Sequence, residues 1–175
     1  MLLLVIVGYV WWLSGRVRRL HRRAEAATAA LDAKLVRRAA ASAVLAEQLA
    51  GPCPKVADDL YAVARAALDA SEAEREAAEN DLTRTLRELT TLVPAPLQRA
   101  PAWPDVVTAS RRVGLARQVH TDLVRDARRV RAQVPVRLFR LARPHPEPAY
   151  FDIDDPGLDQ VPEACADPLP ASETA

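Results

Sequence analysis

The chain has 175 residues, half of them apolar and only 5% aromatic, which suffices for about one domain with a modest core. Abundant Ala and scarce aromatic residues favour closely packed helices and leave little for a sheet rich in aromatic and β-branched side chains. The formal charge of +1 conceals segregated blocks: Arg16 to Ala50 is net basic, Lys55 to Val93 net acidic, Asp105 to Arg143 basic, and the remainder acidic. Local charge is therefore more informative than net charge.

The chain opens with an uncharged apolar run, Leu2 to Leu13, followed closely by five arginines. A helix of this length rises only about 20 Å, against a hydrocarbon core of roughly 30 Å. Bilayer thinning or a start codon placed too far downstream would account for the missing length. The run lacks the basic start and small-residue cleavage site of a secretory signal, although a cleaved signal or a sticky soluble terminus stays open.

We predict a transmembrane anchor over residues 1–15, because aromatic side chains suit the membrane interface and arginines behind them can snorkel. The residues that mark the anchor and its orientation are Tyr9, Trp11, Trp12, Arg16, Arg18, Arg19, Arg22 and Arg23. Since these arginines follow the span, the positive-inside rule places the N-terminus outside and the rest in the cytoplasm, at the plasma or inner membrane. Cys53 and Cys165 form no CxxC pair and are expected to be free thiols, as in the cytoplasm.

All fourteen prolines lie outside or at the edges of three runs, residues 1–51, 55–93 and 105–134. Because an interior proline costs a helix about 3 kcal/mol, each run is predicted to be one long helix. The fold class is therefore all-α: an antiparallel up-down bundle of three long helices over residues 16–151, with a short fourth helix around Val136 to Arg143. Residues 152–175 are acidic and contain prolines, which predicts a disordered tail.

Apolar residues keep helical spacing within each run. The first stripe contains Leu20, Ala24, Ala27, Leu31, Leu35, Leu45 and Leu49, and the second Val56, Leu60, Val63, Ala67, Ala78, Leu82, Leu86, Leu89 and Val93. The third contains Val106, Ala109, Val113, Ala116, His120, Leu123, Ala127, Val130 and Val134. Its alternating steps of three and four are those of a coiled-coil seam, with Leu123 as its largest central side chain.

Few residues suggest chemistry. His120 lies on the apolar stripe without a second ligand three or four positions away, so a buried, hydrogen-bonded structural histidine is favoured over a metal ligand. The acidic run Glu72, Glu74, Glu76, Glu79 and Asp81 is interpreted as a solvated helix face. The sequence contains no phosphate loop, nucleophile elbow or metal-ligand pair, so we predict no enzyme, no catalytic residue, no cofactor and no metal site.

Ten arginines between Arg111 and Arg143 accompany only two acidic residues. The candidate interaction surface consists of Arg128, Arg129, Arg131, Arg137, Arg140 and Arg143. Nucleic acid is not expected, because aromatic interleaving is almost absent. Anionic lipid is the alternative ligand, but in an upright three-helix bundle this stretch would end far from the membrane. Pairing with the acidic middle helix and tail is therefore expected instead.

Several short segments carry a resemblance to a known family through their order and spacing: Leu35-x-Arg37-Arg38-Ala39, Ala64-Arg65-Ala66-Ala67-Leu68, Ala78-Glu79-Asn80-Asp81-Leu82, Trp103-Pro104-Asp105, Arg112-Val113 with Ala116-Arg117, Asp122, Val124, Arg125, Pro135 and Tyr150-Phe151. Together they resemble the LemA-like family of single-pass membrane proteins, from the anchor to about Phe151. Where the family has Glu-Asn and Tyr-Asn pairs, this chain has Ser110-Arg111, His120-Thr121 and Ala127-Arg128. The resemblance implies an N-out anchor, a cytoplasmic helical bundle and no established activity.

The resulting hypothesis is a membrane-anchored cytoplasmic scaffold, with the bilayer and unidentified proteins as partners and helix faces that would also allow self-association. The alternative is a module that senses anionic lipid or remodels membranes through the Arg-rich third helix.

Overall fold

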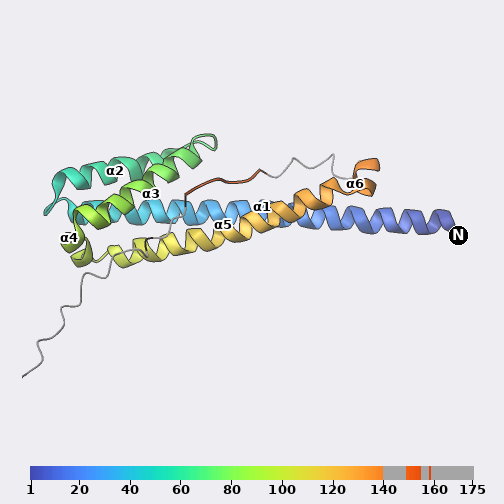
Figure 1. Cartoon of the computed structure of the whole chain (residues 1–175), viewed down its shortest axis with the longest axis horizontal. Coiled ribbons are helices and arrows are strands. Elements are labelled where there is room, and N and C mark those ends of the chain that lie inside the picture. The colour runs from blue at the N-terminus through green and yellow to red at the C-terminus, as the bar shows by residue number, and fades with distance from the viewer. Residues whose placement is uncertain (140–148, 155–157, 159–175) are drawn as a thin grey trace, which may run out of the picture.

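The computed structural model describes residues 1–139, 149–154 and 158, without the side chains of Leu2 and Leu3. Within these residues the fold is all-α and contains no strand, which confirms the predicted class. Arg140, Arg143 and most of the predicted tail lie outside the described residues. The molecule is long and narrow, with one helix extending along nearly its whole length (Figure 1).

The long axis is formed by α1 (Leu2–Leu49) and α5 (Trp103–Ala132), which lie antiparallel to each other. At one end, the Gln48 side chain accepts a hydrogen bond from the Ala102 backbone amide at 2.9 Å. Toward the other end, a 3.2 Å contact joins Arg131 Nη1 to His21 Nε2. These two contacts establish the direction of α5. We call the end with the N-terminus the proximal end and the opposite end the distal end.

A helical hairpin covers the distal half of α1 (Figure 1). It consists of α2 (Pro54–Asp69) and α3 (Arg75–Leu92), and the short α4 (Pro94–Arg99) then leads into α5. The predicted turn at Gly51 to Pro54 is confirmed, and Pro54 begins α2, where a missing amide hydrogen is tolerated.

The prediction of one helix over residues 55–93 is wrong, because the chain reverses between Asp69 and Arg75. Ala70 adopts an extended backbone with ψ 132°. The Ser71 hydroxyl and amide then contact the Glu74 carboxylate, at 2.6 and 3.4 Å. Such local side-chain bonds offer the backbone an alternative to helix, so a reversal needs no proline.

This reversal changes the direction of everything after it. In the predicted three-helix arrangement, the Arg-rich helix would run away from the N-terminal segment. With α2 and α3 as separate antiparallel helices, α5 instead starts at the distal end and returns to the proximal end (Figure 1). The short α6 (Val134–Leu138) then buries Val136 in a cluster with Leu13, Val17 and Val130.

The largest core cluster lies at the distal end, where α1 packs against the hairpin and the start of α5. A smaller cluster in the middle joins Leu31, Leu35, Val113 and Ile153. On the proximal side of this cluster α5 packs mainly against α1, so the seam is narrow. Val124 is buried at 1% exposure, whereas Leu123 is only partly buried, so the predicted central residue of the third stripe is off by one position.

The predicted tail begins on the bundle surface rather than away from it. The Asp152 and Asp154 backbone amides donate to side chains of α3, to Glu76 Oε1 at 3.1 Å and to Asn80 Oδ1 at 2.8 Å. Ile153 between them is buried, as is Leu158. The start of this segment therefore belongs to the packed body.

The proximal end of α1 extends past α6, and no other helix among the described residues lies beside it there (Figure 1). In the described part of the chain, no helix combines the length and the apolar character that crossing a membrane requires. The physical reason is that α1 passes within one continuous helix from the apolar run directly into the arginines from Arg16 onward. The predicted transmembrane span over residues 1–15 is thus not supported as a full crossing.

Candidate functional site

The proximal part of α1 presents apolar side chains that are largely exposed in the described chain. Leu4 is 72% exposed, Val7 57% and Trp11 76%, and their spacing of three and four places them along one face. Contiguous apolar surface of this kind is rare on monomeric soluble proteins and marks a membrane or protein contact.

The apolar segment ends in an aromatic and cationic stack. The Tyr9 and Trp12 rings lie 6.2 Å apart, and the Arg16 guanidinium lies 5.7 Å from the Trp12 ring centroid. Tyrosine and tryptophan suit the boundary between water and hydrocarbon, because each combines an apolar ring with a polar group that can stay hydrated. Trp12 therefore marks the junction between the apolar and the basic parts of α1.

Three of the five arginines between Arg16 and Arg23 share one face of α1, because Arg16, Arg19 and Arg23 are separated by three and four residues. This face opposes the proximal part of α5 across a pocket of about 540 Å³. The pocket is lined by Trp12, Arg16, Arg19, Leu20, Arg23, Asp126, Arg129, Val130 and Gln133. We call it the arginine pocket. Arg18 and Arg22 are exposed on other faces of α1 and do not line it.

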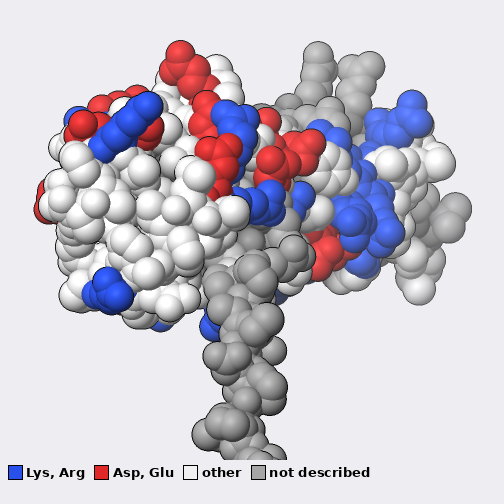
Figure 2. All heavy atoms as spheres, turned by 60° about the vertical axis from the view of Figure 1, so that its left-hand side comes forward, with Lys and Arg blue, Asp and Glu red and all other residues white. Residues whose placement is uncertain are grey.

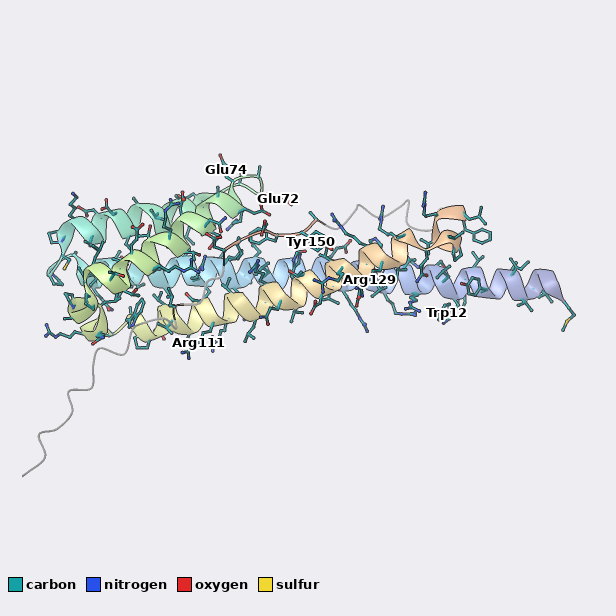
Figure 3. All side chains as sticks on the ribbon, viewed as in Figure 1. Trp12, Glu72, Glu74, Arg111, Arg129 and Tyr150 are labelled. Carbon is teal, nitrogen blue, oxygen red and sulfur yellow. The ribbon has the colours of Figure 1, made fainter. Side chains whose placement is uncertain are left out.

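The predicted interaction surface on α5 is divided among different roles. Arg129 lines the arginine pocket, with its Nη1 4.0 Å from Asp126 Oδ1. The Arg128 guanidinium instead lies 4.4 Å from the Tyr150 ring centroid, and Arg131 points to His21. Figure 3 shows Arg129 and Trp12 in the proximal half of the molecule, on α5 and α1. Arg137 is exposed on α6.

His21 lies between arginines in the sequence, but its side chain is buried at 2% exposure. Its Nδ1 lies 2.9 Å from the Val17 carbonyl oxygen, and its Nε2 lies 3.2 Å from Arg131. This geometry fits a ring that donates from Nδ1 and accepts at Nε2. His21 thereby connects α1 to α5 directly beside the arginine pocket.

A buried ion pair between α1 and α3 lies in the distal half. Arg38 and Glu79, both 0% exposed, are bonded directly through Nη2 and Oε2. Arg38 also donates to Thr83 Oγ1 at 3.0 Å and to the Glu79 carbonyl oxygen at 3.1 Å. The Thr83 hydroxyl donates to the same carbonyl at 2.8 Å. A pair desolvated to this degree fixes how the hairpin lies on α1, because any other register would leave two charges unpaired.

The sequence interpretation missed this pair, and it placed Glu79 wrongly on a solvated face. Glu72, Glu74 and Asp81 are exposed as expected, and Figure 3 shows the first two at the turn between α2 and α3. A signal was present in the first stripe, where Arg38 and Ser42 continue the spacing of three and four between Leu35 and Leu45. A polar interruption of one core stripe indicates a buried partner of opposite charge on another.

His120 is buried at 2% exposure with its Nε2 3.1 Å from Thr28 Oγ1, which confirms a hydrogen-bonded structural histidine. It lines a cavity of about 750 Å³ between α1, the start of α3 and the segment around Tyr150. Its Nδ1 has no hydrogen-bond partner among the described residues. Burial lowers the pKa of His120 from the ordinary imidazole value.

This lowered pKa predicts a loss of stability in mild acid. Below a pH of about 6.5 the unfolded imidazole takes up a proton that the folded one resists, so stability is complete above that pH and falls as pH decreases toward the folded pKa. We expect the chain to lose stability relative to His120→Gln between pH 7.5 and 5.5, by at most about 1.4 kcal/mol per pH unit. Parallel urea-unfolding curves of the two proteins across this range would contradict the expectation.

Charge on the surface follows the same division as the packing. Figure 2 shows acidic side chains over the hairpin and its turn, and basic side chains gathered toward the other end.

Among the described residues, no group of three or more His, Cys, Asp or Glu side chains could hold a metal ion. The absence of enzymatic activity stays a prediction. Comparison of the chain with protein-family models, with curated proteins and with solved structures gave no match in any of the three.

Proposed function

We propose that this chain is a membrane-attached helical interaction protein, held on anionic bilayers by the apolar proximal segment of α1 and by the arginines of α1 and α5. The observation that carries the proposal is the coincidence of both features at one end. Exposed apolar residues from Leu4 to Trp11 lie directly next to basic residues of two antiparallel helices. Apolar burial and attraction to anionic headgroups add together at such a surface.

The return of α5 removes the geometric argument against lipid contact through the Arg-rich helix. Arg129 and Arg137 lie at the proximal end, where they would face a bilayer that holds the apolar segment. Each arginine near an anionic surface contributes about 1 kcal/mol. The lipid-binding alternative and membrane attachment thus become parts of one mechanism.

The cytoplasmic leaflet carries the anionic lipids, so the basic surface favours attachment from the cytoplasmic side, with the bundle projecting into the cytoplasm. The positive-inside rule gives the same side, and with a crossing segment it would leave the N-terminus outside. The LemA-like resemblance stays part of this proposal. An apolar N-terminal helix followed by a helical bundle is the arrangement that the resemblance implies.

A scaffold that binds another protein through a helix face is the second candidate. Leu115 and Val119, separated by one helical turn on α5, are 63% and 57% exposed. This apolar patch is smaller than the proximal one. Crosslinking of the full chain at position 119 in native membranes would identify a protein partner at this face.

Vesicle binding of the full chain tests the membrane proposal. We expect the triple substitution Leu4→Ser, Val7→Ser, Trp11→Ser to weaken binding to vesicles containing phosphatidylglycerol about a hundredfold or more. Burial of each of these side chains contributes about 1.5–3 kcal/mol, so even partial insertion produces this effect. Binding is measured by co-sedimentation at two salt concentrations, and higher salt should weaken it further.

The matched control removes three exposed apolar residues from the distal half, Val44→Ser, Tyr61→Ser and Leu92→Ser, whose exposed fractions are 48%, 46% and 67%. This variant should bind vesicles like the original protein. Equal losses in the two triple variants, or no vesicle binding by the original chain, would refute the proposal.

A further inference from the structure

The arginine pocket brings guanidinium groups from two helices together around one hollow, which attraction to a membrane in general does not require. Arg16, Arg19 and Arg23 line it from α1, and Arg129 lines it from α5. Among the described residues that line it, Asp126 alone is acidic, so this lining carries a clear excess of positive charge. Its volume of about 540 Å³ is within the range of small-molecule sites, which are roughly 300–1,000 Å³.

The chemistry of these side chains points to phosphate. Guanidinium groups are planar forks that bind two oxygens of a phosphate at once, and several forks around one pocket can bind one group from different sides. An ideal Cβ at Gly15 would lie 3.4 Å from Arg19 Nη1, so the Arg19 guanidinium lies close along the α1 backbone beside the pocket. A phosphomonoester carries about 1.5 to 2 negative charges near neutral pH, which matches this excess better than a singly charged phosphodiester does.

The position of Trp12 identifies the source of the phosphate as a lipid. Trp12 lines the pocket and also ends the exposed apolar segment. A headgroup in the pocket would therefore have its acyl chains beside Val5, which is 65% exposed and lies about two helical turns before Trp12 on the same face of α1. These chains would lie in the same hydrocarbon layer as the exposed apolar residues of α1. A free phosphate would gain nothing from this arrangement.

We propose that the arginine pocket is a specific site for the headgroup of a phosphomonoester lipid. The proposal rests on the membrane attachment proposed above, and adds to it a preference among anionic lipids. Arg16, Arg19, Arg23 and Arg129 bind the phosphate, and Trp12 contacts the glycerol end of the lipid. Asp126 limits the affinity by competing for Arg129.

The test compares two lipids in vesicles of equal surface charge, phosphatidic acid and phosphatidylglycerol, with the full chain as ligand. The original protein should bind phosphatidic acid vesicles about tenfold more tightly, as expected for additional charge-assisted hydrogen bonds. The double variant Arg19→Gln, Arg129→Gln should lose this preference, and Asp126→Asn should increase it. The double variant Arg18→Gln, Arg22→Gln removes equal charge outside the pocket and should keep it.

These residues are exposed or line an open pocket, so a melting curve for each variant should match that of the original chain. Equal loss of preference in the two double variants, or no preference in the original chain, would overturn the site while leaving membrane attachment intact. Binding of inorganic phosphate with the affinity of the lipid would show that the ligand is a free anion and overturn the lipid assignment. Failure to bind either vesicle would instead refute membrane attachment itself.

Discussion

Replacing Glu79 with alanine should lower the free energy of unfolding by about 3–5 kcal/mol, the largest stability effect that we expect from one substitution. Glu79 is fully buried and is the carboxylate partner of Arg38, which is also fully buried. Removal of the carboxylate leaves a guanidinium without a counter-ion in a region from which water is excluded. Urea unfolding followed by circular dichroism at 222 nm measures the effect.

Two controls separate the ion pair from packing. Arg65→Ala breaks an exposed pair with Asp69, whose side chains are 51% and 65% exposed, and should cost under about 1 kcal/mol. The double variant Arg38→Met, Glu79→Leu should recover most of the loss, because a buried pair can be replaced by apolar side chains at little cost. A double variant as unstable as Glu79→Ala would contradict this account of the pair.

The double variant Arg38→Met, Glu79→Leu also leaves the neighbouring hydroxyl groups with their hydrogen-bond acceptors. Thr83 donates to the backbone carbonyl of Glu79, and Ser42 donates to that of Arg38 at 2.9 Å. Both carbonyls remain when the side chains change. We therefore expect the buried charges to contribute to the choice of register between α1 and the hairpin more than to net stability.

The sequence predicted the helical class and the outer limits of the long helices, because proline and apolar periodicity report directly on helix formation. It did not predict the reversal at Ser71, which depends on side-chain bonds to Glu74 and not on a helix-breaking residue. This one turn determines which end of the molecule holds the Arg-rich end of α5. A local bond of modest strength thus has a global topological consequence.

The residues of the candidate site were only partly predictable, because the sequence pattern shows the type of each residue but not which distant residues meet. Trp12 and the arginines behind it stood out because aromatic and basic residues followed an apolar run. Their convergence with Arg129 could not be predicted, since residues more than a hundred positions apart meet only once the direction of α5 is known. Glu79 was misplaced because an acidic run has the same composition whether or not one member turns inward.

The direction of α5 is the claim on which the proximal basic surface depends, and a distance across that end tests it most directly. Spin labels would be attached at position 18 on α1 and position 137 on α6, both exposed, in a variant with Cys53 and Cys165 replaced by serine. Pulsed electron paramagnetic resonance then measures the distance between the two labels. Each label is adjacent to a member of the buried cluster of Leu13, Val17, Val130 and Val136. We therefore predict a separation far shorter than the roughly 45 Å length of α5, whereas a separation of about 45 Å or more would show that α5 runs the other way.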